Sequence, residues 1–383
     1  MSCNSLFITG ATGFVGAALT LELLRVHRRD RAFCLVRGGD DSDARKRLAA
    51  TLTRAAAAYD VPAADLVDIL RRVVPVRGDI TRPGLGLAPG ALRALAGDAP
   101  FTVWHSAASL KDSEEALAEI VLHNVTGTEN LLEALLPVGV RAFNHVSTAY
   151  VCGRRNGVIS ETLERPRGFN NRYEQSKHYG EMLVVDHCGR ARVPWRVLRP
   201  GIVIAHSVTG RATGYTGYLG WVLKLAALAD GTGDLLRRQP LRYLARPDAV
   251  LNVIPVDSVV EDCLGIDAAG AATQDRVFHL TNGAAPTNRW LCDVSAATLG
   301  LMPIALIGEE GALDPVSARF HRWTRFERPY ALGQKEFSRT ASDALYPSPR
   351  HGHCPIDERL MRHMIVEGLA DWRAQQAGKA GAA

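Results

Sequence analysis

The chain has 383 residues, enough to bury a large core in one big or two modest domains. Its 47% hydrophobic and 22% charged residues are typical of a globular protein, and no apolar run is long enough to span a membrane. The net charge of +5 comes without a basic cluster interleaved with aromatic residues, which argues against a nucleic-acid surface. Seven scattered cysteines, without a Cys-x-x-Cys pair, predict neither a disulfide framework nor a metal site. Because a strand is expected from residue 5, we expect no signal peptide and a cytoplasmic location.

A strand, a glycine-rich turn and a helix follow one another at the start of the chain. Residues 5–9 form a short apolar stretch, and apolar residues recur at helical spacing over 17–26. The first glycine of the turn permits a tight bend, the second lets backbone N–H groups approach phosphate, and the third lets helix and strand pack closely. This order predicts a dinucleotide site, although the spacing is G-x-x-G-x-x-G rather than G-x-G-x-x-G. The expected contact residues are Gly10, Thr12, Gly13, Phe14, Val15 and Gly16.

The end of the second expected strand, residues 32–36, indicates which cofactor binds. NAD-preferring sites place an acidic residue about twenty residues past the glycines, where it binds the ribose 2′-hydroxyl. This chain has Arg37 there, and a guanidinium suits a phosphate, so we expect NADPH, with Arg47 as a candidate second cation. The alternative is that Arg37 is a solvated loop residue and that Asp40 or Asp41 binds a ribose.

Strand-like and helix-like segments alternate through the first half of the chain. Helices are expected over 43–59, 89–96 and 114–136, and further strands over 73–76, 101–104, 143–147 and 195–198. Such alternation is typical of an α/β fold with a doubly wound parallel (Rossmann) sheet, whose ligands bind beyond the carboxyl ends of the strands. The residues that fall at such ends are Gly10, Arg37, Asp79, Ala107, Thr148 and Pro200.

Tyr173 and Lys177 lie four residues apart on an expected helix, so their side chains are neighbours on one face. The lysine charge favours the phenolate and is expected to lower the pKa of Tyr173 toward working pH. A phenol tuned in this way acts as a general acid toward a carbonyl oxygen whose carbon receives a hydride. Ser147 and Thr148 offer a hydroxyl within reach of the phenol. A Tyr-x-x-x-Lys spacing is common on amphipathic helices, so its meaning depends on the cofactor site.

The texture of the sequence changes beyond residue 205. Residues 213–220 form a loop rich in glycine and tyrosine, and the strand pattern returns at 251–255 and 277–280. We therefore expect a nucleotide-binding domain of residues 1–205 plus 249–283. A smaller, mostly helical substrate-binding cap is expected from residues 206–248 plus 284–377, with a disordered tail at 378–383. The loop around 215–221 and the cap are expected to line the substrate pocket.

Ten short motifs form a set that is typical of one superfamily. They are TGATGFVG (9–16), CLVR (34–37), GDI (78–80), HSAA (105–108), NVTGT (124–128), HVSTAY (145–150), YEQSK (173–177), LRPGI (198–202), NVIPVD (252–257) and FHLTN (278–282). The set resembles the extended short-chain dehydrogenase/reductase superfamily. More narrowly, it is similar to the thioester-reductase branch, which includes fatty acyl-CoA reductases and the terminal reductase domains of carboxylic acid reductases and nonribosomal peptide synthetases.

The resemblance implies roles for individual positions. Thr148, Tyr173 and Lys177 become the catalytic set, with Ser147 as the competing hydroxyl. Asn124 either orders a lysine-bound water or is a bend or polar core residue within its helix. The other implied cofactor contacts are Asp79 and Ile80 along the adenine, Ala107, Ala108 and Ser109 along the nicotinamide ribose, and Pro200, Gly201, Ile202 and Val203 against the nicotinamide.

Residues and resemblance together predict an NADPH-dependent reductase of acyl thioesters that releases an aldehyde or an alcohol. The substrate would be carried on coenzyme A or on a phosphopantetheinylated carrier protein, acidic partners that a mild positive charge favours. Two alternatives stay open. One is a ketone or alcohol dehydrogenase, or a sugar-nucleotide epimerase, with the same site; the other is a cofactor-sensing protein on an inactive dehydrogenase fold. A monomer and a homodimer both fit the sequence.

Overall fold

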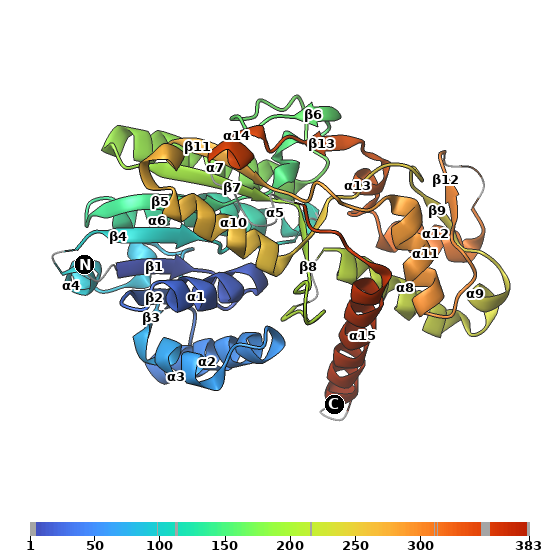
Figure 1. Cartoon of the computed structure of the whole chain (residues 1–383), viewed down its shortest axis with the longest axis horizontal. Helices are drawn as coiled ribbons and strands as arrows, with labels where there is room; N and C mark the ends of the chain where they lie inside the picture. Colours follow the sequence, from blue (N-terminus) through green and yellow to red (C-terminus); the bar gives the residue numbers. More distant parts are fainter. Residues whose placement is uncertain are drawn as a thin grey trace.

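A seven-stranded parallel sheet forms the centre of the computed structural model (Figure 1). The structure describes residues 5–97, 99–111, 114–214, 217–309, 311, 313–345 and 353–380. In sheet order the strands are β11 (Arg276–Leu280), β7 (Trp195–Pro200), β5 (Val140–Val146), β4 (Phe101–His105), β1 (Ser5–Thr9), β2 (Arg31–Val36) and β3 (Val73–Arg77). The expected doubly wound α/β fold is confirmed.

Helices cover both faces of this sheet, which explains why its strands are apolar on both sides. One buried cluster joins β1 and β2 to α1 (Phe14–Val26), α2 (Asp41–Ala58) and α10 (Val256–Ala268). A second cluster, on the opposite face, joins the sheet to α4 (Ala91–Ala96), α6 (Gly127–Leu135) and α7 (Arg172–Ala191). Chain order reverses between β1 and β4, so the ends of these two strands form the switch point at which ligands bind in such folds.

Two helical regions differ from the expectation. The helix expected over 114–136 is divided into η2 (Glu114–Ala116), α5 (Leu117–Val121), a π-helical turn η3 (Leu122–Thr126) and α6. The sequence pattern also gave no indication of α3 (Ala63–Arg72), which packs against α1. Three short 3-10 turns complete this part of the chain: η1 (Pro83–Gly86), η4 (Ala149–Cys152) and η5 (Gly270–Thr273).

A third buried cluster lies beside the sheet and is built mainly by the described parts of residues 206–248 and 284–377, here called the cap. In Figure 1 the cap stands beyond one end of the sheet. The division into two domains with the boundaries given above stays a prediction. The cap contains α8 (Tyr218–Thr232), α9 (Leu235–Arg238), α11 (Asn288–Thr298), α12 (Pro315–Trp323), α13 (Arg328–Leu332), α15 (Glu358–Ala380) and the paired strands β9 (Arg242–Leu244) and β12 (Ala305–Ile307). Helix α14 (Thr340–Leu345) lies in the same residue range but packs against β11 of the main sheet.

Two more strand pairs connect the sheet with the cap. The strand expected near 251–255 is β10 (Val253–Pro255), which pairs with β8 (Ile202–Ile204) instead of joining the main sheet. β13 (Lys335–Phe337) returns from the cap to pair with β6 (Gly157–Ile159). Helix α15 continues to Ala380, so the first three residues of the expected disordered tail are helical, and 381–383 lie outside the described residues. No helix in the described ranges combines the length and apolar character needed to span a membrane.

Candidate active site

A cavity of about 960 Å³ begins at the carboxyl ends of the central strands and extends to the cap. Most of the predicted cofactor and catalytic residues line it. The predicted residues on the cavity wall are Gly10, Thr12, Gly13, Phe14, Val15, Gly16, Ala108, Ser147, Thr148, Tyr173, Lys177, Pro200, Gly201, Ile202 and Val203.

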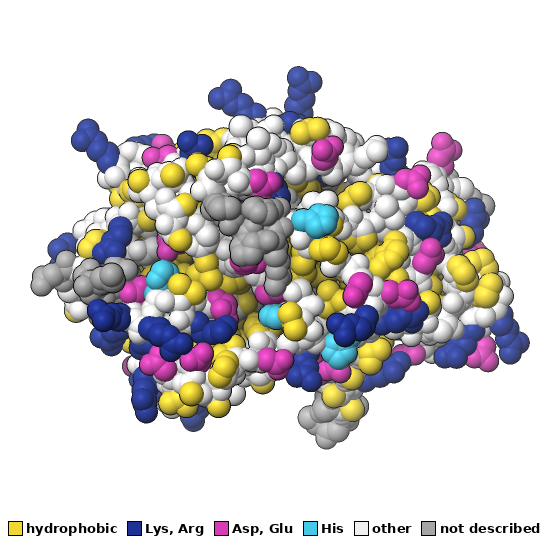
Figure 2. All heavy atoms as spheres, in the orientation of Figure 1, with side chains coloured by type: hydrophobic (Ala, Val, Ile, Leu, Met, Phe, Trp, Pro, Cys, Tyr) yellow, Lys and Arg dark blue, Asp and Glu magenta, His cyan; other side chains and the backbone are white. Residues whose placement is uncertain are grey.

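On the face seen in Figure 2, lysine and arginine side chains are interspersed with acidic ones, so the positive net charge is not gathered into one basic surface there.

The glycine-rich turn is as tight as the sequence predicts. Gly10 has φ +76°, a backbone conformation that favours glycine, and a Cβ added there would lie 2.6 Å from the Ser106 hydroxyl. A Cβ added at Gly16 would lie 2.1 Å from the carbonyl oxygen of Gly10. Gly13 is the N-cap of α1 and its N–H donates to Gly10 O at 2.8 Å. The turn therefore brings bare backbone and the positive end of α1 to the cavity, a cradle that fits a pyrophosphate.

The catalytic candidates come from two neighbouring elements. Ser147 and Thr148 follow β5, and Tyr173 and Lys177 lie on the first turns of α7, which begins at its N-cap Asn171. The N-cap is satisfied because the Glu174 N–H donates to Asn171 Oδ1 at 2.9 Å. All four candidate side chains line the same cavity.

The two hydroxyls differ in their hydrogen bonds. Thr148 caps η4, with its Oγ1 accepting from the Tyr150 N–H at 3.3 Å. The Ser147 Oγ is buried and has no hydrogen-bond partner among the described residues. The choice between these two hydroxyls stays a prediction in favour of Thr148.

The expectation that Lys177 lowers the pKa of Tyr173 is wrong for this structure. Burial raises the pKa of Tyr173 above its ordinary value, and the neighbouring Glu174 carboxylate adds to the rise. The Lys177 ammonium instead donates to Val146 O at 2.7 Å and lies 3.4 Å from His145 Nε2. Burial also lowers the pKa of Lys177 to about 8, because an ammonium loses its hydration there.

Asn124 lies in the π-helical turn and is buried. Its Oδ1 accepts from the Ser109 N–H at 2.6 Å, and its Nδ2 donates to Ser109 O and to Ser176 Oγ, both at 2.9 Å. The side chain thus ties the segment after β4 to α7. Both interpretations of Asn124 stay open. Its place in the π-helical turn matches a bend or polar core residue, and its hydrogen bond to α7 places it beside the helix of Lys177, where it could order a water.

Seven predicted residues do not line the cavity. Asp79 accepts from Thr81, while Ile80 belongs to the core beneath α6. Arg37 is exposed, 3.5 Å from His123 Nε2, and its carbonyl oxygen accepts from Arg47 Nη1 at 2.7 Å. The others are Ala107, Ser109 and Asn124, which lie around the segment after β4.

Several cavity residues were missed by the prediction. Tyr150, two positions after Thr148, stood in a quoted motif, and Ser106 and Leu110 flank the predicted Ala107–Ser109 segment, so spacing could have found them. The cap was expected to line the pocket, but the sequence assigned no individual contact there. Its polar and aromatic members include Tyr218, Trp221, Lys224, Tyr243, Glu327 and Tyr330. Of the predicted loop, Gly217, Tyr218, Gly220 and Trp221 line the cavity, and Tyr215 lies outside the described residues.

A model of an NAD-binding family, described as "Male sterility protein", matches residues 8–263. The chain belongs to this family. The chain is 31% identical over 303 residues to the isonitrile lipopeptide synthase of Mycobacterium tuberculosis, covering 73% of this chain and 11% of that protein. It is 27% identical over 319 residues to the putative fatty acyl-CoA reductase CG8306 of Drosophila melanogaster, covering 73% and 59%. The chain therefore spans less than two thirds of either relative.

A solved structure gives the same fold. The terminal R domain from the myxalamid PKS-NRPS biosynthetic pathway matches with a TM-score of 0.76 and 23% identity, covering 96% of this chain and 90% of that one. The resemblance inferred from the motifs is thus confirmed. The segment that the male sterility protein model matches holds every predicted site residue but ends before α11, so the cavity residues from α11 onward lie outside the family match.

Proposed function

We propose that this protein reduces an acyl thioester with NADPH and releases an aldehyde, or an alcohol after a second reduction. The observation that carries the proposal is that the glycine turn and the Ser147, Thr148, Tyr173 and Lys177 side chains line one cavity that reaches into the cap. The relatives support this class of substrate, because their names refer to acyl-CoA and to peptide synthesis. The thiol that carries the acyl group belongs either to coenzyme A or to the phosphopantetheine of a carrier protein.

The residues of this chain divide the work as follows. The turn at Gly10, Gly13 and Gly16 would hold the pyrophosphate of the dinucleotide, and bound NADPH would supply the hydride. Tyr173 donates a proton to the oxygen of the thioester carbonyl as its carbon gains the hydride, and the Thr148 hydroxyl donates a second hydrogen bond to that oxygen. The resulting hemithioacetal loses the thiol to give the aldehyde, so that one hydride and one proton are consumed per aldehyde formed.

A preference for NADPH over NADH rests on Arg37 and its neighbours. Arg47 donates to the carbonyl oxygen of Arg37, which brings two guanidinium-bearing residues to the end of β2. The competing carboxylates have other partners: Asp40 accepts from the Asp43 N–H as the N-cap of α2, and Asp41 pairs with Arg77 at 2.7 Å. Two cations suit a 2′-phosphate better than they suit a 2′-hydroxyl.

The test is a panel of acyl thioesters and ketones assayed with NADPH and NADH, with products identified by mass spectrometry. We expect aldehyde or alcohol from thioesters with NADPH. Tyr173→Phe should lower turnover about 10²- to 10⁴-fold, the usual contribution of a general acid, and leave the Kd for NADPH nearly unchanged. The matched control is Tyr179→Phe, because Tyr179 is exposed on the same helix and should be dispensable. Turnover of ketones alone, or wild-type rates in Tyr173→Phe, would contradict the proposal.

A further inference from the structure

The cap side of the cavity carries an ion pair that the proposed chemistry does not use. Lys224 on α8 and Glu327, just before α13, both line the cavity, and Lys224 Nζ lies 2.5 Å from Glu327 Oε1. Their side chains are 36% and 19% exposed, so the pair is half-buried, and the Glu327 carboxylate is the partner that loses most of its hydration. An ion pair in such a place is costly unless its remaining hydrogen-bonding capacity is also used.

Each residue of the pair can form further hydrogen bonds. The second carboxylate oxygen of Glu327, Oε2, is buried and accepts no hydrogen bond from the described residues. An ammonium has three donors, and within the described chain Lys224 donates its one hydrogen bond to Glu327. Because the last torsion of a glutamate is soft, the carboxylate can turn and present either oxygen. The pair thus offers one acceptor and at least one donor, while its net charge is zero.

The surroundings of this pair are aromatic and lie next to the catalytic residues. Tyr330, three residues after Glu327, stacks edge-on against Tyr150 with ring centroids 4.7 Å apart. The Tyr330 hydroxyl also accepts from Asn171 Nδ2 at 2.8 Å, and Asn171 is the N-cap of the helix that carries Tyr173. A substrate that reaches Tyr173 from the cap therefore passes close to this segment.

We propose that the Lys224–Glu327 pair recognises a secondary amide of the thioester substrate, a step that rests on the proposed function. An amide is neutral and planar and offers one N–H and one carbonyl oxygen, which match the carboxylate and the ammonium. A hydrocarbon would displace water from both charges without giving them hydrogen bonds, and a charged group would add an unbalanced charge beside them. The amide belongs either to the acyl chain, as in a peptidyl or N-acylaminoacyl group, or to a pantetheine arm, and the experiment separates these sources.

The experiment compares matched thioesters in which one amide replaces two methylenes at successive positions of an eight-carbon acyl chain. Each chain is joined either to pantetheine or to 2-mercaptoethanol, which has no amide, and kcat/KM is measured with NADPH. We expect an acyl amide at one position, or the pantetheine arm, to raise kcat/KM about 10- to 100-fold, as for hydrogen bonds to charged groups. The double variant Lys224→Met/Glu327→Leu, which removes both the donor and the acceptor, should abolish that preference, and Glu327→Gln, which keeps an acceptor but loses the charge, should reduce it. An effect confined to pantetheine identifies the arm, and one that follows the acyl amide identifies the chain.

Controls separate this inference from the function on which it rests. Glu358→Gln breaks an exposed ion pair with Arg362 on the cap helix α15 and should change nothing. The affinity for NADPH, measured by fluorescence, should be equal in all variants, which shows that they fold. If hydrocarbon and amide thioesters react equally and the variants behave as wild type, the inference falls while the function stands. If no thioester reacts although NADPH binds, both fall.

Discussion

The buried Lys177 ammonium sets a pH dependence that can be measured without substrate. Burial lowers its pKa from 10.5 to about 8 in the folded protein. Between these two values the unfolded chain binds more protons at this residue than the folded chain, so stability rises as pH rises from about 8 to about 10.5. The size of the rise is roughly 3 kcal/mol, from about 1.4 kcal/mol per pKa unit.

The measurement is denaturant unfolding of the wild type and of Lys177→Met across this pH range. Subtracting the free energy of unfolding of Lys177→Met from that of the wild type removes the contributions of other titrating groups. This difference should increase as pH rises, because only the wild type gains stability from Lys177. Below about pH 8 the difference should be flat, since lysine is then protonated in both states. A difference that stays constant throughout would mean that Lys177 titrates with its ordinary pKa.

At the scale of elements, α7 is held against β7 by a fully buried ion pair. Arg199 donates to Glu181 through Nε at 2.9 Å and Nη2 at 2.6 Å, and both side chains are completely buried. Glu181 lies one turn after Lys177, and Arg199 precedes Pro200 on the cavity wall. The pair therefore fixes the distance between the catalytic helix and the strand whose end would face the cofactor.

We predict that Glu181→Gln lowers the free energy of unfolding by about 3–5 kcal/mol, because it leaves a buried guanidinium without its counter-charge. The control is Asp186→Asn on the same helix, which removes an exposed ion pair with Arg190 and should cost at most about 1 kcal/mol. Thermal or urea unfolding of both variants decides the point. Equal small losses would show that the buried pair does not hold the helix.

The sequence predicted those elements whose signal is local. The buried strands are continuous apolar runs, and the turn at Gly10 needs glycine whatever surrounds it. The π-turn at Asn124 escaped prediction because its side-chain partners, Ser109 and Ser176, come from other elements. The direction of the Tyr173 pKa shift was missed for a related reason. Spacing places Lys177 beside the phenol, but only the fold shows that the ammonium turns toward Val146 and that burial raises the pKa of Tyr173.

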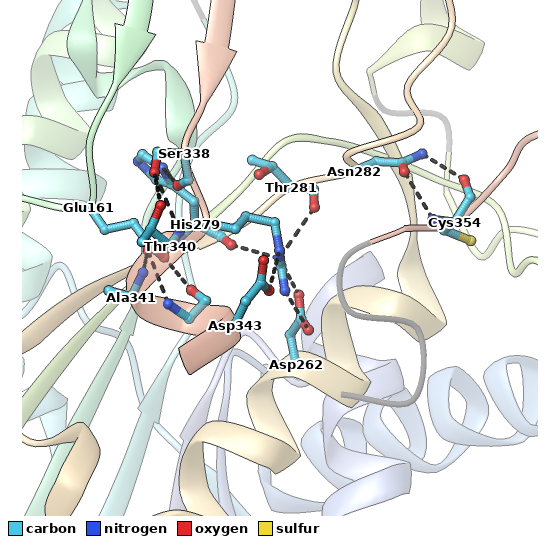
Figure 3. Close-up of polar contacts among 12 residues, drawn as sticks. Glu161, Asp262, His279, Thr281, Asn282, Ser338, Thr340, Ala341, Asp343 and Cys354 are labelled. Carbon is cyan, nitrogen blue, oxygen red and sulfur yellow. Dashed lines mark hydrogen bonds and ion pairs between the residues drawn. The ribbon is translucent and has the colours of Figure 1, made fainter. Parts of the chain in front are cut away.

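At the scale of the whole molecule, the segment that follows α13 returns from the cap and packs against the Rossmann domain. β13 pairs with β6, and Arg339, two residues later, is buried beside α10 and the end of β11. Its guanidinium donates to Asp262 at 2.8 Å and 3.2 Å, to His279 O at 2.8 Å and to Thr281 O at 3.2 Å (Figure 3). The cap thus touches the core through both the cavity wall and this anchor.

Arg339→Met should destabilise the protein by about 3–5 kcal/mol, since the Asp262 carboxylate loses its buried guanidinium. The effect should be greatest in the returning segment, so hydrogen exchange of residues 335–345 should accelerate more than that of the central strands. The double variant Arg339→Met/Asp262→Leu should recover much of the loss, because apolar side chains replace a buried ion pair at little cost. If the double variant is no more stable than the single one, the other partners of Arg339, the two backbone carbonyls and Asp343 at 3.3 Å, hold the anchor together rather than the pair with Asp262.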